Sequence, residues 1–433
     1  MLERLMKAAE QAEVFEIESE ATKVGFEANK MKSFEVEETR GMAARVVVDG
    51  RLGFAASSNT EAIDRLVANA LESARHGDAA LFRFPTPRPG PVVQVYDPEL
   101  AALPTERLIE MGREMVETVV EVEPEAHVKV DLERRVGRTS VRNSAGTEVA
   151  EEKAPLSISV MVERVRGDDV VVLFDYFNTA VRDEEYQAFT RRIADKLRLA
   201  RRAATLSSGR MPVLFSPSGA PVLGLPLMLG LNGKNVYRSI SPMAGRVGER
   251  LFDEKLTVVD DPTLDGRPGS GSHDDEGMPR QRQVLIERGV LRGFVYDLKT
   301  AAQAGAEPTG HGERGLFSPP SPSFSNLVVE GTPTVPLAEI VAGIERGLLV
   351  ESPLGLGQGN VISGVFSNNL SLAFKIEGGE IVGRVKDVSI AGNIYQDLRH
   401  IEALSREAEW VYGGLRLPYV LLPELNVVTK GEG

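Results

Sequence analysis

The sequence predicts an α+β protein with an N-terminal mixed strand and helix domain and a C-terminal, mainly antiparallel β domain with long loops. Three observations lead to this prediction. A chain of 433 residues is longer than most single domains. Its first half mixes strand-like alternation with helical periodicity. From about Gly209 onward, glycine and proline become frequent and hairpin signals prevail. We therefore expect domains over residues 1–205 and 206–433.

The first domain is expected to begin with two long strands and to end with a helix. Apolar and polar residues alternate in the strand segments, and Asp49-Gly50 is a turn signal. The strands are expected at residues 12–27, 33–48, 126–135, 138–149, 154–166 and 169–177. Apolar residues recur at helical spacing in three further segments, which predicts helices over residues 60–76, 105–122 and 183–204. The proline-rich residues 84–98 indicate an extended connector.

The second domain is expected to be a sheet that carries loops of functional length. Hairpin turns are predicted at Glu287-Arg288-Gly289 and Glu377-Gly378-Gly379, between short apolar runs. Glycine and proline mark irregular loops at residues 241–281, 305–325 and 351–360. Long loops on a sheet scaffold are common places for binding or catalytic residues.

The composition excludes some classes of protein and disfavours others. Fifty Lys and Arg against 63 Asp and Glu give a net charge of −13, so nucleic acid is an improbable main partner. There is no cysteine, which excludes disulfides and thiolate zinc ligands and fits a cytoplasmic location. Acidic residues interrupt the N-terminal segment where a secretory signal needs an apolar stretch. The longest apolar run, Val222 to Leu231, is too short to span a bilayer, so no membrane association is expected.

Two loops carry residue types that bind ligands. His273, Asp274, Asp275 and Glu276 together are able to hold a divalent cation through oxygen ligands, but consecutive side chains on a loop diverge. Composition therefore favours an acidic surface or structural loop. The second loop, Gly310-His311-Gly312, fits G-x-G-x-x-G by letter and lacks the strand and helix that a dinucleotide site requires. Its histidine would contribute to a site only if the fold brings the two loops together.

An ordered set of segments in the second half resembles the TldD/PmbA family. The set begins with Asp275-Glu276-Gly277 and the hairpin QVLIERGVLRGFVYD, and continues with PTGHGERG and GLGQGNVISG. It ends with FKIEGGEI, VKDVSIAGNI and LLPEL. The first half agrees more loosely, through its strand and helix layout and its NSAG turn.

The resemblance implies a metallopeptidase-related fold and two branches. The TldD branch carries zinc on a helical H-E-x-x-x-H motif that follows a P-V-V-L-type strand, and a later cysteine. When the strand Pro212–Phe215 is used for alignment, the three motif positions fall on Leu225, Pro226 and Gly230. None of these residues binds zinc or acts as a general base. The chain therefore resembles the PmbA branch, also called TldE, which lacks the zinc ligands and pairs with TldD.

The expected function is that of a non-catalytic subunit in a TldD/PmbA-type zinc metallopeptidase complex. The resemblance implies a TldD-type partner that holds the zinc, no cofactor in this chain, and unfolded peptides as substrates for degradation or maturation. A homodimer remains an open alternative. A second hypothesis is an autonomous metal-dependent peptidase that uses residues 273–276 and His311. A third is a regulatory protein that binds a topoisomerase.

Overall fold

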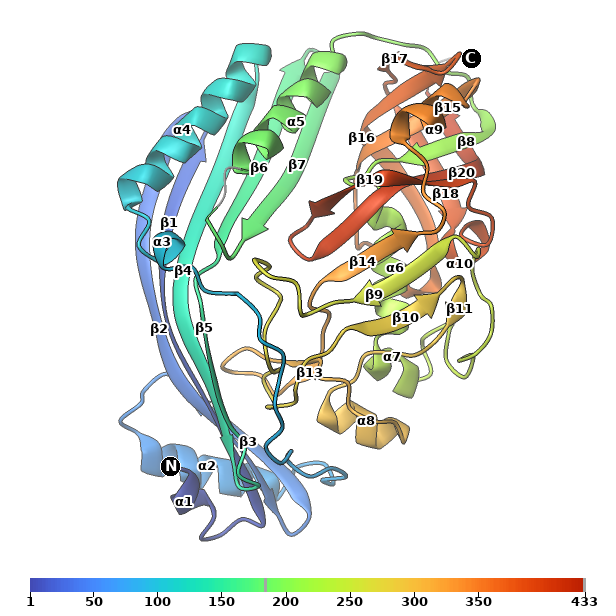
Figure 1. The fold of residues 1–433 in the computed structure, drawn as a ribbon. Helices are drawn as coiled ribbons and strands as arrows, with labels where there is room; N and C mark the ends of the chain where they lie inside the picture. The colour runs from blue at the N-terminus through green and yellow to red at the C-terminus, as the bar shows by residue number, and fades with distance from the viewer. Residues whose placement is uncertain (183–184, 431–433) are drawn as a thin grey trace.

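Two large β-sheets organise the molecule (Figure 1). The structure is a computed structural model that describes residues 1–182 and 185–430. The first sheet has seven antiparallel strands in the order β3-β2-β1-β4-β6-β7, with β5 beside β4. Its strands are β1 (Gln11–Glu27), β2 (Lys30–Val48), β3 (Arg51–Ser57), β4 (His127–Asn143), β5 (Glu148–Lys153), β6 (Leu156–Arg166) and β7 (Asp169–Thr179).

Helices cover one face of the first sheet, and its other face is turned toward the second half of the chain (Figure 1). Val14 packs with α1 and α2, and Val24 packs with α4 and α5. These two β1 residues are an even number of positions apart, so they lie on one face. Phe15, on the opposite face, packs against Leu316. The helices of this half are α1 (Leu2–Leu5), α2 (Ile63–Ala74), α3 (Pro98–Ala101), α4 (Thr105–Val122) and α5 (Glu185–Leu199).

The second sheet has eleven strands, most of them antiparallel. Its order is β11-β10-β9-β14-β20-β18-β16-β15-β8, with β17 beside β16 and β19 beside β20. Among the described strands of this sheet, only the β14–β20 and β15–β8 pairs are parallel. The first part comprises β8 (Gly209–Phe215), β9 (Leu256–Asp260), β10 (Gln283–Glu287), β11 (Val290–Leu291) and β14 (Leu327–Gly331). The rest are β15 (Arg346–Pro353), β16 (Val365–Glu377), β17 (Glu380–Arg384), β18 (Val388–Asn393), β19 (Ala403–Val411) and β20 (Leu415–Thr429).

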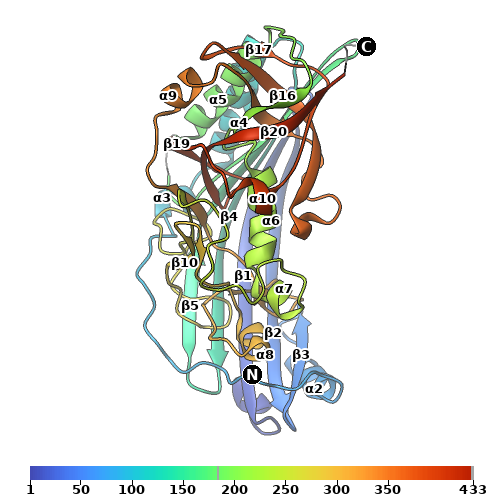
Figure 2. The same ribbon diagram turned by 90° about the vertical axis from the view of Figure 1, so that its right-hand side faces the viewer.

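Short helices and a small two-stranded sheet decorate the second half (Figure 2). The helical segments are α6 (Pro221–Leu231), α7 (Gly233–Tyr237), α8 (Leu298–Ala304), α9 (Leu337–Ala342), the 3-10 turn η1 (Val361–Ser363) and α10 (Ile394–Asp397). The two-stranded sheet pairs β12 (Gly312–Glu313) with β13 (Ser321–Pro322). No helix in the described part of the chain combines the length and apolar character needed to cross a lipid bilayer.

The predicted α+β class is confirmed, and most element predictions hold. The helix over 105–122 matches α4, and both predicted hairpin turns join strand pairs, β10–β11 and β16–β17. The separate strands predicted at 126–135 and 138–149 are wrong, because β4 runs through Gly137 without a break. The predicted helix start at Asp183 lies outside the described residues. The first sheet ends at Thr179 and the second begins at Gly209, while the domain boundary at 205/206 stays a prediction.

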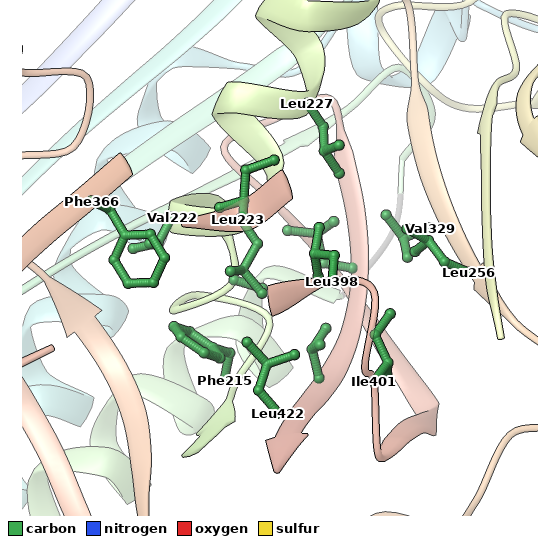
Figure 3. Close-up of a cluster of buried hydrophobic side chains, with 14 of the residues drawn as sticks. Phe215, Val222, Leu223, Leu227, Leu256, Val329, Phe366, Leu398, Ile401 and Leu422 are labelled. Carbon is green, nitrogen blue, oxygen red and sulfur yellow. The ribbon is translucent and has the colours of Figure 1, made fainter. Parts of the chain in front are cut away.

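The apolar run at 222–231 forms α6 and is largely buried, as its composition predicts. Val222, Leu223 and Leu227 pack with Phe215 and Leu422 in the largest core of the second half (Figure 3). Of this helix only Leu229 is exposed, and Leu225 and Met228 are half-buried. A second core joins both halves, since residues from α4, α5, β6 and β7 pack with Leu214, Leu349 and Phe374.

Candidate functional site

The acidic loop lies between the two halves of the chain and is tied to the proline-rich connector. His273 Nε2 is 2.9 Å from the carbonyl oxygen of Arg88, and its Nδ1 is 3.0 Å from Ser272 Oγ. At Gly90, an added Cβ would stand 2.3 Å from the carbonyl oxygen of Ser272, so only glycine allows the connector to approach so closely. The connector thus fixes the orientation of the imidazole.

Asp274 holds the loop itself together. One carboxylate oxygen accepts the backbone N–H groups of Glu276 and Met278, at 3.0 and 2.9 Å, and the other accepts that of Gly312 at 2.9 Å. Gly277, with φ of 78°, completes the turn. Burial raises the pKa of Asp274, partly offset by these N–H donors. Because its two oxygens already accept three backbone N–H groups, this carboxylate has a structural role in the loop.

Glu276 is fully buried and joins the two halves electrostatically. Its Oε1 is 2.6 Å from a guanidinium nitrogen of Arg45 on β2, and its Oε2 accepts the N–H of Leu298 at 2.7 Å. Arg45 also binds Glu13 on β1, and Glu13 in turn lies 2.7 Å from the guanidinium of Arg314. Burial, reinforced by Asp274, raises the pKa of Glu276 to about 8 although Arg45 opposes the shift.

The fold brings the His311 loop against the acidic loop, yet turns the His311 side chain away. The backbone N–H of Asp275 donates to the carbonyl oxygen of Gly312 at 2.9 Å. An added Cβ at Gly312 would stand 2.4 Å from Glu276 Oε2, and one at Gly310 would stand 2.6 Å from the carbonyl oxygen of Pro279. His311 is fully buried, with Nε2 2.9 Å from Asp260 Oδ2 and Nδ1 2.9 Å from the Thr309 oxygens.

These side chains do not fit a metal ion. Their oxygens and nitrogens form hydrogen bonds to separate partners within the chain. Glu276 in particular is already bonded to the guanidinium of Arg45. Within residues 1–182 and 185–430, no three or more His, Asp or Glu side chains are arranged to hold a metal ion. The acidic loop therefore acts as a junction between the halves.

The loop nevertheless borders a cavity of about 280 Å³ against the first sheet, the junction cavity. His273, Asp274 and Asp275 line one wall, together with Arg280 and Glu313. The opposite wall comes from the middle of β1, β4 and β5, including Ile17, Ser19, Thr139, Val149 and Glu151. Burial raises the pKa of Asp275 to about 6, and Glu313 adds to the shift.

The positions that the family's zinc motif would occupy lie on α6. Leu225 and Pro226 line a second cavity of about 360 Å³, the α6 cavity, whose other walls are residues 354–358, Val361 and residues 365–369. Gly230 faces the interior: an added Cβ would stand 2.6 Å from Met243 Cε and from Tyr395 Oη. The Tyr395 hydroxyl donates to the carbonyl oxygen of Pro226 at 3.1 Å.

Sequence reasoning missed two features. The buried cluster of Glu13, Arg45 and Arg314 was not foreseen, although Arg45 stands alone in the apolar run Met42–Val48, which is a signal for a buried ion pair. The α6 cavity was also missed, because the glycine-rich segment that lines it lies more than a hundred residues from the helix.

Comparison with known proteins places this architecture among metallopeptidase-related proteins. Residues 208–429 match the family described as the PmbA/TldA metallopeptidase C-terminal domain, and residues 12–74 match domain 1 of the same family. The chain belongs to the PmbA/TldD family, as its ordered motifs predict.

One relative matches this chain over the full length, another over part of its length, and a solved structure shares the fold. The uncharacterized protein MJ0231 of Methanocaldococcus jannaschii is 27% identical and covers 100% of this chain and 99% of its own length. A metalloprotease of Methanothermobacter thermautotrophicus is 27% identical over 64% of this chain, and the match spans 61% of that protein. The crystal structure of TldE from Thermococcus kodakarensis shares the fold, with a TM-score of 0.90, 24% identity and coverage of 99% and 98% of the two chains.

Proposed function

We propose that this chain is the non-catalytic subunit of a PmbA/TldD-type zinc metallopeptidase complex, which processes or degrades unfolded peptides in the cytoplasm. The observation that carries the proposal is the chemistry of α6. Zinc in peptidases is bound by imidazole, carboxylate or thiolate. The three motif positions carry Leu225, Pro226 and Gly230, and the chain has no cysteine.

The surroundings of α6 argue further against a zinc site in this chain. Met243 and Tyr395 occupy the space that a side chain at position 230 would need. Pro226 is buried, and its carbonyl oxygen is bonded to Tyr395. The residues present do not fit zinc, so the proposal assigns the metal and the hydrolytic step to a TldD-type partner subunit.

The role proposed for this chain is to complete the space in which the partner holds its substrate. An extended peptide is recognised mainly through its backbone, which permits broad sequence tolerance. The junction cavity supports this role, since it combines apolar side chains with both signs of charge between sheet and loop. A homodimer is the alternative assembly if no TldD-type partner binds.

Metal analysis of the purified, untagged chain, followed by a reconstitution assay, tests the proposal. We expect less than roughly a tenth of a zinc ion per chain, against about one per chain for a metallopeptidase with a complete ligand set. Hydrolysis of an unfolded peptide should require both this chain and a TldD-type protein, and should stop when chelator removes the partner's zinc.

Two results would contradict the proposal. Near-stoichiometric metal in the isolated chain, with peptide hydrolysis that is lost in a Glu276→Ala/His311→Ala double variant, would support the autonomous peptidase instead. Equal hydrolysis by the TldD-type protein with and without this chain would remove the subunit role. The control is the Leu229→Ala variant, which changes an exposed residue of α6 that lies at no motif position and lines no part of the α6 cavity, and which should leave reconstituted hydrolysis intact.

A further inference from the structure

The α6 cavity has a glycine-rich wall, residues 354–358. The chain continues from this wall to η1, which packs on α6. Gly355, Gly357 and Gly359 have φ angles of 73°, 80° and 74°, and no residue between them has positive φ. Alternation of the sign of φ gathers successive amides on a concave surface, and such surfaces bind anions.

Three glycine amides at and beside this wall have no partner within the described chain. Gln358 N–H donates to the carbonyl oxygen of Gly355 at 3.2 Å. In the described chain, the N–H groups of Gly355, Gly357 and Gly359 meet no acceptor. Backbone donors are normally paired with protein groups or solvent, and unpaired ones beside a cavity are available to a ligand.

The remaining walls define what kind of anion fits. No described residue that lines the α6 cavity carries a charge, in a chain with a net charge of −13. Val222, Leu225 and Phe366 form an apolar wall, and Figure 3 shows the side chains of Val222 and Phe366 side by side. Asn368 is already occupied, since its amide donates to the carbonyl oxygen of Leu354 at 2.7 Å. Phosphate sites commonly add arginine or lysine to their backbone donors, and none lines this cavity, whereas a C-terminal carboxylate is bound by backbone N–H groups alone in several peptide-recognition sites.

We propose that the α6 cavity binds the C-terminal carboxylate of a peptide, with the unpaired amides of Gly355 and Gly357 beside the carboxylate and the last, apolar side chain against Val222, Leu225 and Phe366. The proposal deepens the proposed function, on which it rests only for the class of ligand. The position at which catalytic relatives are expected to bind metal would, in this chain, hold the end of a substrate or product peptide.

Gly357 offers a matched pair of substitutions for the test. An added Cβ there meets no atom within 4 Å, so a side chain has room. Asparagine and aspartate both tolerate a positive φ and have the same shape. Gly357→Asp places a negative charge beside the amides, and Gly357→Asn controls for bulk and strain.

The measurement is binding of an N-terminally labelled, unstructured hexapeptide ending in leucine to the isolated full chain, followed by fluorescence anisotropy. We expect the free-acid peptide to bind roughly tenfold more tightly than its carboxamide, because charged acceptors form the stronger hydrogen bonds. Gly357→Asn should keep this ratio, whereas Gly357→Asp should abolish it without changing carboxamide binding.

Three results would overturn the proposal: equal affinity for acid and carboxamide, equal effects of the two Gly357 variants, or stronger competition by inorganic phosphate than by acetate. Absence of binding by either peptide would do the same. The binding assay contains neither the partner nor zinc. Its failure would therefore contradict the carboxylate site without contradicting the subunit role, and failure of reconstituted hydrolysis would do the opposite.

Discussion

Asp275 is a carboxyl group whose ionisation the folded chain opposes. Its Oδ2 accepts the N–H of Arg314 at 2.9 Å, but burial raises its pKa to about 6. A pKa above that of the unfolded chain stabilises the fold below about pH 4, and this contribution is lost as the pH rises through 6. We expect Asp275→Asn, which imitates the protonated form, to gain on the order of 3 kcal/mol over the wild type above pH 7 and almost nothing at pH 4.

Urea unfolding of both proteins at several pH values between 4 and 8 measures this difference. Asp78→Asn is the control, because Lys299 lowers the pKa of that exposed carboxyl and its removal should bring no gain at high pH. A stability difference between wild type and Asp275→Asn that stays constant from pH 4 to pH 8 would contradict the argument.

Single residues also show how far the sequence predicts the site. The acidic loop and the glycine-flanked His311 are recognisable from composition, and the structure does bring their backbones together. What each side chain does depends on remote partners. Glu276 is hydrogen-bonded to Arg45, 231 positions away, and His311 is hydrogen-bonded to Asp260, 51 positions away. No local sequence pattern encodes such pairings. The sequence alone therefore left a cation site as one hypothesis beside an acidic surface or structural loop.

At the scale of elements, two glycines in α6 have opposite roles. An added Cβ at Gly224 meets nothing within 4 Å, while at Gly230 it would overlap Met243 and Tyr395. Gly224→Ala should therefore stabilise the chain by about 0.5–1 kcal/mol through helix propensity. Gly230→Ala should destabilise it by about 1–3 kcal/mol through overpacking. Denaturant titration of both variants gives the two signs, and a gain from Gly230→Ala would show that this end of α6 has room for a larger side chain.

Elements with strong periodicity were predictable, and those set by tertiary contact were not. The helix over 105–122 has a clear apolar stripe, and α4 has the same bounds. The strands predicted at 12–27 and 33–48 leave room for the turn between β1 and β2, but no turn signal marks it, because Ala28 and Asn29 adopt φ of 46° and 68° without a glycine. The gap predicted between the strands at 126–135 and 138–149 contains Gly137, which lies within β4, where an added Cβ would stand 2.7 Å from Ser19 Cβ on β1. Glycine there permits close approach of two strands, which the sequence cannot distinguish from a turn.

The whole molecule depends on contacts between its halves. Arg45 from the first sheet is hydrogen-bonded both to Glu13 of the same sheet and to Glu276 of the second half, and all three are buried. A shared apolar core adds to this connection. Because of these contacts, we expect the two halves to unfold together in one transition.

Arg45→Met tests this connection between the halves, because it removes the guanidinium that binds the buried side chains of Glu13 and Glu276. We expect a loss of about 3–5 kcal/mol. Arg40→Met, on the same strand, removes a pair with Glu18 in which the side chains are 64% and 65% exposed, and should cost less than about 1 kcal/mol.

Fluorescence of Trp410, the single tryptophan, reports on the second half, and far-ultraviolet circular dichroism reports on both sheets. The two probes should give coincident urea curves in the wild type, and Arg45→Met should shift both to lower urea. Separate curves in the wild type would mean that the halves unfold independently. Equal shifts in Arg45→Met and Arg40→Met would mean that the apolar core alone holds the halves together.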